Sequence, residues 1–168
     1  MKYDRSYYEG IFVSFLRSRR LPYTGIDEAR RTLLPRHHGA NELKSFDYVL
    51  YGGERNYIVD LKGRKLGKGA PACWATRDDI RGMLTWETLF GPGFRALLVF
   101  MYECDSQPAD GSFDGTFVHQ RLWYCFRAVC ARDFESRMKT RSARWNTVDL
   151  AASDFDRFRT PFPPRETA

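Results

Sequence analysis

Hydrophobic and polar residues alternate with a period of two over residues 45–65. Aromatic and branched side chains recur at every second position in 46–50 and again in 57–61, with a Gly-Gly turn between the two runs. This pattern predicts a β-hairpin. A two-residue loop of Gly53 and Glu54 suits a type II′ turn, whose first central position favours glycine.

The loop also fixes the register of the predicted hairpin. Counting outward from it places Asp47 opposite Asp60, and like charges at facing positions, with Cβ atoms about 4.5–5.5 Å apart, destabilise a sheet. Lys62 leaves the same face of the sheet as Asp60. Two carboxylates beside one ammonium indicate a Mg²⁺ site with a charge-stabilising lysine at its edge.

A solvated polar face, on which Lys62 only neutralises Asp60, is the alternative interpretation. The metal site is favoured because the residues around Asp60 are apolar on both faces of the strand, which predicts a buried position where charge is costly. A pattern that breaks a folding rule tends to mark a functional position.

The rest of the chain predicts an α/β order of elements. Residues 4–19 suit an amphipathic helix with Glu9 at the margin of its apolar stripe, and residues 94–102 suit a strand covered on both faces. A capping box over Thr76–Asp79 begins a helix that stops at Gly91, and capping accounts for Asp78 and Asp79. The remaining expectations are an extended segment at 21–24, a weak helix at 27–34, a loop with His37 and His38, strand character over 117–129 and a short helix over 131–140.

Asp47, followed through the hairpin by Asp60-Leu61-Lys62, resembles the signature of the PD-(D/E)XK nuclease superfamily. Restriction endonucleases, Holliday junction resolvases and repair nucleases belong to it. The resemblance implies a single-domain restriction-endonuclease-like α/β fold, in which a central mixed β-sheet is flanked by helices. It assigns Asp47 and Asp60 to binding one or two Mg²⁺ ions, and Lys62 to the attacking water or the transition state.

The resemblance extends to the N-terminal helix. Many members of the superfamily carry a glutamate on the helix before the first motif strand, and Glu9 occupies that place. Glu9 is therefore expected as a third acid of the metal site. The sequence departs from the family at Phe46, which replaces the proline of the family name, and no Gln-x-x-x-Tyr motif follows.

These features predict a nuclease that uses Mg²⁺ or Mn²⁺ to hydrolyse phosphodiester bonds of nucleic acid, with DNA as the expected polymer. One alternative is a catalytically inactive module of the same fold that binds nucleic acid or protein. A second alternative is a structural protein whose basic face binds an acidic partner. Small nucleases of this fold often act as dimers, and a homodimer is suggested for this chain by that analogy alone.

Length and charge agree with this prediction. A chain of 168 residues suits one domain, here a core over about 1–130 with a basic and aromatic extension over about 131–168. The net charge of +6, rich in arginine, favours a polyanionic partner. The cations and Trp145 of the extension suit phosphate contacts and a stacked base. The alternative interpretation is that the cations are solvated at the surface and Trp145 fills the core. The expected phosphate contacts are Arg64, Lys65, Lys68, Lys139, Arg141 and Arg144.

Cysteine usage and hydropathy bear on the compartment. The four cysteines form no CxxC pair, and no signal peptide precedes them, so reduced thiols in the cytoplasm are expected. No stretch approaches the roughly 20 apolar residues of a membrane span.

Overall fold

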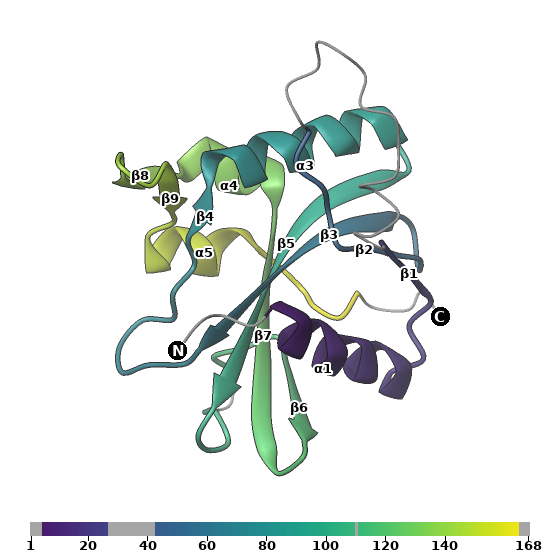
Figure 1. Cartoon of the computed structure of the whole chain (residues 1–168), viewed down its shortest axis with the longest axis vertical. Coiled ribbons are helices and arrows are strands. Elements are labelled where there is room, and N and C mark those ends of the chain that lie inside the picture. Colours follow the sequence, from purple (N-terminus) through teal and green to yellow (C-terminus); the bar gives the residue numbers. More distant parts are fainter. Residues whose placement is uncertain (1–4, 27–42, 110, 165–168) are drawn as a thin grey trace.

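The computed structural model describes residues 5–26, 43–109 and 111–164 (Figure 1). Seven strands form the main sheet in the order β1-β2-β3-β5-β7-β10, with β6 paired to β7, and β4-β9-β8 form a small second sheet. The elements are α1 (Arg5–Ser18), β1 (Tyr23–Gly25), β2 (Tyr48–Leu50), β3 (Asn56–Lys65), β4 (Ala75–Thr76), α3 (Arg77–Phe90), β5 (Phe94–Cys104), β6 (Gly115–His119), β7 (Leu122–Cys130), α4 (Ala131–Arg137), β8 (Lys139–Ser142), β9 (Thr147–Asp149), α5 (Ala152–Phe158) and β10 (Arg159–Thr160).

The predicted hairpin is confirmed in its register as well as its position. Strands β2 and β3 are antiparallel, with Tyr48 opposite Val59. Extended outward, this register sets Asp47, the residue before β2, opposite Asp60. Gly53 has φ +67° and Glu54 is not in the left-handed region, as a type II′ turn requires.

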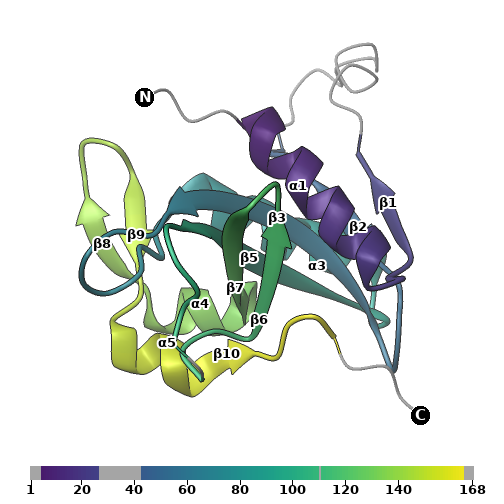
Figure 2. The ribbon, with the colours of Figure 1, turned by 90° about the horizontal axis from the view of Figure 1, so that it is seen from below.

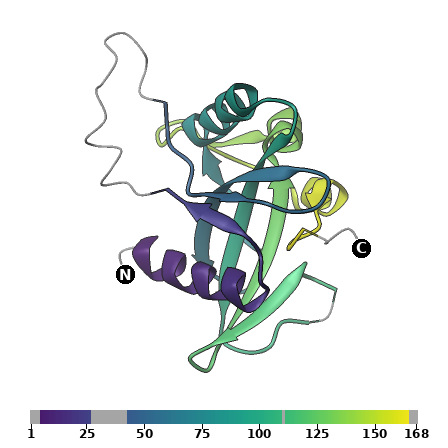
Figure 3. The same ribbon diagram turned by 90° about the vertical axis from the view of Figure 1, so that its right-hand side faces the viewer.

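Strand β3 alternates between two apolar layers. Val59 and Leu61 pack with α1, whereas Ile58 packs with Met83 of α3. Helix α1 covers one face of the main sheet, and α3, α4 and α5 cover the other (Figure 2, Figure 3). Because side chains alternate along a strand, Asp60 and Lys62 leave the sheet on the side of α3.

Strand β5 is the central strand that its continuous apolar run predicts. It pairs in parallel with β3 and antiparallel with β7, so the sheet is mixed. Leu97 and Val99 pack on the α1 side, while Leu98 and Phe100 pack against the opposite helices, and all four are buried. This arrangement confirms the predicted α/β class with a mixed sheet between helices.

Glycine at position 63 lets α1 approach β3 closely. A Cβ atom at Gly63 would lie 2.2 Å from a ring atom of Tyr8, far inside van der Waals contact. The buried Tyr8 ring therefore rests directly on the β3 backbone. This contact brings the first turn of α1, with Arg5 and Glu9, to the strand that carries Asp60 and Lys62.

The strand character expected over 117–129 is confirmed, but it belongs to two strands, β6 and β7. Residues 117–129 do not form one run of strand, because the chain reverses at Gln120 and Arg121 between β6 and β7. Both turn residues have positive φ, 47° and 69°, a turn geometry that normally favours Asn or Gly. The sequence lacks that signal, so the hairpin was missed.

The other local expectations have mixed outcomes. The segment at 21–24 overlaps β1, and the short helix expected over 131–140 appears as α4, which ends at Arg137 before β8 begins at Lys139. The helix expected at 27–34 and the loop with His37 and His38 lie outside the described residues.

The C-terminal elements join both sides of the main sheet. Strand β10 pairs with β7 at the sheet edge. Phe162 is buried in the core beneath α1, and Phe155 is buried on the opposite side. In the described ranges, no helix is long and apolar enough to cross a lipid bilayer.

Candidate active site

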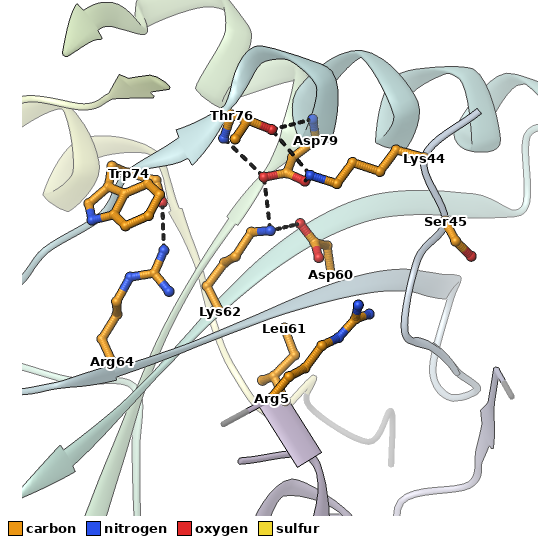
Figure 4. Close-up of a pocket in the computed structure, with 10 residues that line it drawn as sticks. All are labelled: Arg5, Lys44, Ser45, Asp60, Leu61, Lys62, Arg64, Trp74, Thr76 and Asp79. Carbon is orange, nitrogen blue, oxygen red and sulfur yellow. Dashed lines mark hydrogen bonds and ion pairs between the residues drawn. The ribbon is translucent and has the colours of Figure 1, made fainter. Parts of the chain in front are cut away.

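A cavity of about 520 Å³ opens where β3 passes the N-terminal end of α3 (Figure 4). Asp60 and Lys62 form its floor from β3, and Arg5 reaches it from α1. Cations and buried carboxylates thus meet in one hollow. The lining residues are Arg5, Lys44, Ser45, Asp60, Leu61, Lys62, Arg64, Trp74, Thr76 and Asp79.

Lys62 lies between two carboxylates. Its Nζ is 2.9 Å from Oδ2 of Asp60 and 2.9 Å from Oδ2 of Asp79. The lysine side chain is 15% exposed, and both carboxylates are more deeply buried. A long flexible side chain is therefore held in one position at the floor of the cavity (Figure 4).

Asp79 also closes the capping box of α3. The amide of Thr76 donates to Oδ2 of Asp79 at 2.9 Å, and the amide of Asp79 donates to Oγ1 of Thr76 at 3.0 Å. Lys44 forms an ion pair with Oδ1 of Asp79. The predicted capping box is confirmed, but capping does not account for Asp79 by itself, since this residue also fixes Lys62.

Lys44 is itself held by the helix that follows the hairpin. The indole Nε1 of Trp86 donates to the carbonyl oxygen of Lys44 at 2.9 Å. A Cβ atom at Gly82 would lie 3.0 Å from that same carbonyl oxygen, so glycine permits the close approach. The segment before β2 therefore packs tightly on α3 beside the cavity.

The environments of these groups shift their pKa values in different directions. Burial raises the pKa of Asp60 to about 7, with Asp47 and Asp79 adding to the rise and Lys62 opposing it. Burial opposes ionisation of Asp79, but Lys62, Lys44 and the Thr76 amide outweigh it and lower the pKa of that carboxyl. Burial would likewise lower the pKa of Lys62, but Asp60 and Asp79 raise it, so the ammonium stays charged.

Asp47 and Glu9 both pair with Arg5. The amide of Leu61 donates to Oδ2 of Asp47 at 2.7 Å, and Nη2 of Arg5 forms an ion pair with Oδ1 of Asp47. Nε of Arg5 lies 2.9 Å from Oε1 of Glu9. The structure therefore brings Asp47 and Glu9 to one guanidinium, beside the carboxylate of Asp60.

The oxygen atoms present suit a hard divalent cation in part. Oδ2 of Asp60 is buried and makes no hydrogen bond within the described chain, apart from its ion pair with Lys62. Carboxylate oxygens are the ligands that Mg²⁺ prefers. Across the described residues, however, no three His, Cys, Asp or Glu side chains are gathered closely enough to hold a metal ion. Asp47 and Asp60 could hold one, and Glu9 could join once Arg5 gives way.

The predicted phosphate contacts are spread over two regions. Arg64 lines the cavity, and its guanidinium lies over the ring of Trp74. The guanidinium of Arg141 on β8 lies over that ring as well. Lys139 on β8 faces Asp149 across the small sheet. The other three, Lys65, Lys68 and Arg144, are exposed and do not line the cavity.

Comparison with known proteins identifies the fold of this chain but no family. No protein-family model matches the sequence, and no curated protein matches it. A solved structure, that of the Holliday junction resolvase Hjc from Archaeoglobus fulgidus, superimposes with a TM-score of 0.52 over 91% of this chain and 93% of that chain. The chain has the restriction-endonuclease-like fold. At 12% sequence identity the likeness concerns the fold alone.

Within the restriction-endonuclease-like fold, several cavity residues were not found from the sequence. Arg5, Lys44 and Trp74 follow no motif, and their roles depend on how α1 and the segments before β2 and β4 pack. The capping-box motif in the sequence places Asp79 at the N-terminus of a helix. Its contact with Lys62 makes Asp79 part of the site, and the sequence does not reveal that Lys62 lies nearby.

Proposed function

We propose that this protein is a nuclease that hydrolyses phosphodiester bonds with the aid of a divalent metal ion, and that DNA is its substrate. The observation that supports it most directly is the buried ammonium of Lys62, held 2.9 Å from Asp60 at the floor of a cavity that also presents Arg5, Lys44 and Arg64. Buried ionised groups are costly and concentrate where chemistry needs them.

Each residue has a defined task in this proposal. Asp47 and Asp60 would hold the ion, with Glu9 as a third ligand, and the ion when bound would supply an activated water and offset charge on the phosphate. Lys62 would orient the water or stabilise the developing negative charge with its ammonium. Asp79 is a positioning residue, since its Oδ2 lies 2.9 Å from the ammonium of Lys62 and holds it next to Asp60.

Cations at the rim support a polyanionic substrate. Arg5 and Arg64 line the cavity from α1 and β3, and guanidinium groups favour bidentate contact with phosphate. When substrate phosphate enters, Arg5 can exchange its carboxylate partners for it. The structural neighbour is named for its action on Holliday junctions, which supports DNA as the polymer.

A cleavage assay tests the proposal. Wild-type protein, Asp60→Asn and Lys62→Ala would be incubated with labelled linear, branched and single-stranded DNA and RNA in Mg²⁺, Mn²⁺ or EDTA. We expect metal-dependent cleavage that falls at least about 100-fold in each variant, while the thermal midpoint shows a folded protein. Arg81→Ala, an exposed cation on α3, is the matched control and should cleave like the wild type.

The outcome distinguishes two functions. Cleavage by Lys62→Ala at the wild-type rate would refute the mechanism, and cleavage in EDTA would refute the metal requirement. A catalytically inactive binding module is the second candidate, favoured by the position of Arg5 between Glu9 and Asp47. Nucleic-acid binding without turnover in any metal would establish that candidate instead.

A further inference from the structure

An aromatic ring lies at the edge of the cavity, between cations from two different elements. The guanidinium carbon of Arg64 is 4.1 Å from the ring centroid of Trp74, and that of Arg141 is 5.1 Å from it. Arg64 also donates to the carbonyl oxygen of Trp74 at 3.2 Å (Figure 4). Trp74 thus joins the cavity to the small sheet that carries Arg141.

The small sheet presents a second, more exposed ring. Trp145 lies in the turn between β8 and β9 and is 68% exposed, so the alternative that it fills the core is wrong. The guanidinium carbon of Arg144 is 5.1 Å from its ring centroid. An exposed indole beside a guanidinium offers a face on which a nucleic-acid base can stack.

This turn is anchored to the candidate active site. Strand β9 pairs with β4, which leads directly into the capping box of α3. The amide of Arg77 donates to the carbonyl oxygen of Asn146 at 2.9 Å, and its guanidinium donates to Oγ1 of Thr140 at 2.6 Å. The hairpin β8–β9 is therefore fixed relative to β4 and the start of α3 (Figure 1), which carries Asp79.

Charge along this surface has one sign. Residues 139–146 contain three cations and no acid. Asp149 is the register partner of Lys139 across the small sheet, whereas Arg141 and Arg144 lie over the rings of Trp74 and Trp145. We name the surface formed by Arg64, Trp74, Arg141, Arg144 and Trp145 the aromatic track.

We propose that the aromatic track binds an unpaired nucleic-acid strand next to the bond that the cavity cleaves. Rings alternating with cations suit single strands, whose bases are free to stack while phosphates meet guanidinium groups. In a duplex the base faces are already stacked and cannot use Trp145. The inference rests on the proposed nuclease function and names its substrate class: nucleic acid with a single-stranded segment at an end, flap or branch.

Equilibrium binding in EDTA tests the aromatic track without cleavage. Fluorescence anisotropy would compare a blunt DNA duplex with the same duplex carrying a single-stranded overhang. We expect the wild type to bind the overhang substrate more tightly, and Trp145→Ala to bind it roughly 5- to 100-fold more weakly than the wild type. The matched control is Leu89→Ala, which removes a side chain of a residue 65% exposed near the C-terminal end of α3 and should bind like the wild type.

Trp74 needs a second variant, because it is half-buried and its loss could loosen the cavity. Trp74→Ala should weaken overhang binding by a similar factor, and Trp74→Phe, which keeps a ring, should restore most of it. Arg141→Ala and Arg144→Ala should each reduce the slope of log affinity against log salt by about 1.

The two proposals fail separately. Equal wild-type affinity for blunt and overhang substrates, or Trp145→Ala binding like the wild type, would overturn the aromatic track even if the protein cleaves DNA. An overhang preference that depends on both tryptophans would support the track even if no metal promotes cleavage.

Discussion

Asp60 and Asp79 share one lysine, yet their surroundings push their pKa values apart. Asp60 is buried, its Oδ2 has no partner among the described residues apart from the ammonium of Lys62, and burial raises its pKa. Asp79 is also buried, but two lysines and a backbone amide lower its pKa. Two carboxylates with opposite shifts are typical of sites in which one group is functional and the other supports it.

Asp60→Asn should make the protein more stable at pH 8. The folded-state pKa of Asp60, about 7, lies above its ordinary 3.8, so the folded state binds the proton more tightly and stability falls as pH rises between those values. Asparagine mimics the protonated form and removes this cost, which at about 1.4 kcal/mol per pKa unit is roughly 4 kcal/mol at pH 8. Urea unfolding at pH 8 and pH 4 measures the difference, which should vanish at the lower pH; a less stable variant at pH 8 would contradict it.

Asp79→Asn should have the opposite effect. Its folded-state pKa lies below the ordinary 3.8, so the ionised carboxylate contributes stability above that value and loses it as pH falls through the folded pKa. We expect the variant to be about 2 kcal/mol less stable at pH 7. The same unfolding measurement should show the gap closing as pH falls below about 4. A gap that does not depend on pH would mean that packing, not charge, gives Asp79 its effect.

The residues of the site that lie on the β2–β3 hairpin were predictable, and those from other elements were not, for a physical reason. Asp60 and Lys62 follow from the period of a strand, which fixes their common face within a single element. The partners of Lys62 and Asp47 come from other elements, so Asp79, Lys44 and Arg5 depend on tertiary packing. The metal-ligand roles of Asp47, Asp60 and Glu9 stay predictions until a metal is measured.

At the scale of elements, the contact between α1 and β3 sets the distance from Glu9 and Arg5 to the floor of the cavity. Gly63→Ala would place a methyl group 2.2 Å from a Tyr8 ring atom, in a strand that cannot bend away. We expect a loss of about 1–3 kcal/mol in unfolding free energy from overpacking. Thermal and urea unfolding measure it.

Gly10 on helix α1 provides the control for the Gly63→Ala prediction. No atom lies within 4 Å of a Cβ added at Gly10 of α1. Gly10→Ala should therefore stabilise the protein by about 0.5–1 kcal/mol, the usual gain of alanine over glycine in a helix. If both substitutions shift stability alike, the close packing of Tyr8 on Gly63 is not what limits the approach of α1.

Elements were predictable wherever their signal was local. The β2–β3 hairpin, the capping box of α3 and the apolar run of β5 each carry a pattern within one segment. The β6–β7 turn was missed because Gln120 and Arg121 adopt positive φ without the residues that favour it. Strands β4, β8 and β9 have at most four residues each, too few for a period to show.

At the scale of the whole molecule, the last described residues complete a core that the first helix begins. Phe162 is 1% exposed and its ring centroid lies 6.1 Å from that of Phe12. Phe162→Ala should cost about 3–5 kcal/mol, as for other buried aromatic residues replaced by alanine. Urea unfolding measures the loss, with Trp145→Ala as the exposed aromatic control, expected within about 0.5 kcal/mol of the wild type. A small effect at Phe162 would mean that α1 and the sheet pack adequately without it.

The double role of Asp79 has an evolutionary consequence. The same carboxylate caps helix α3 and contacts the lysine of the site. Selection for stability and selection for activity therefore act on a single side chain. A substitution at Asp79 that changes the capping of α3 would also change how Lys62 is held. In a mutational library, the effect of a substitution at Asp79 should therefore depend on which residue stands at position 62.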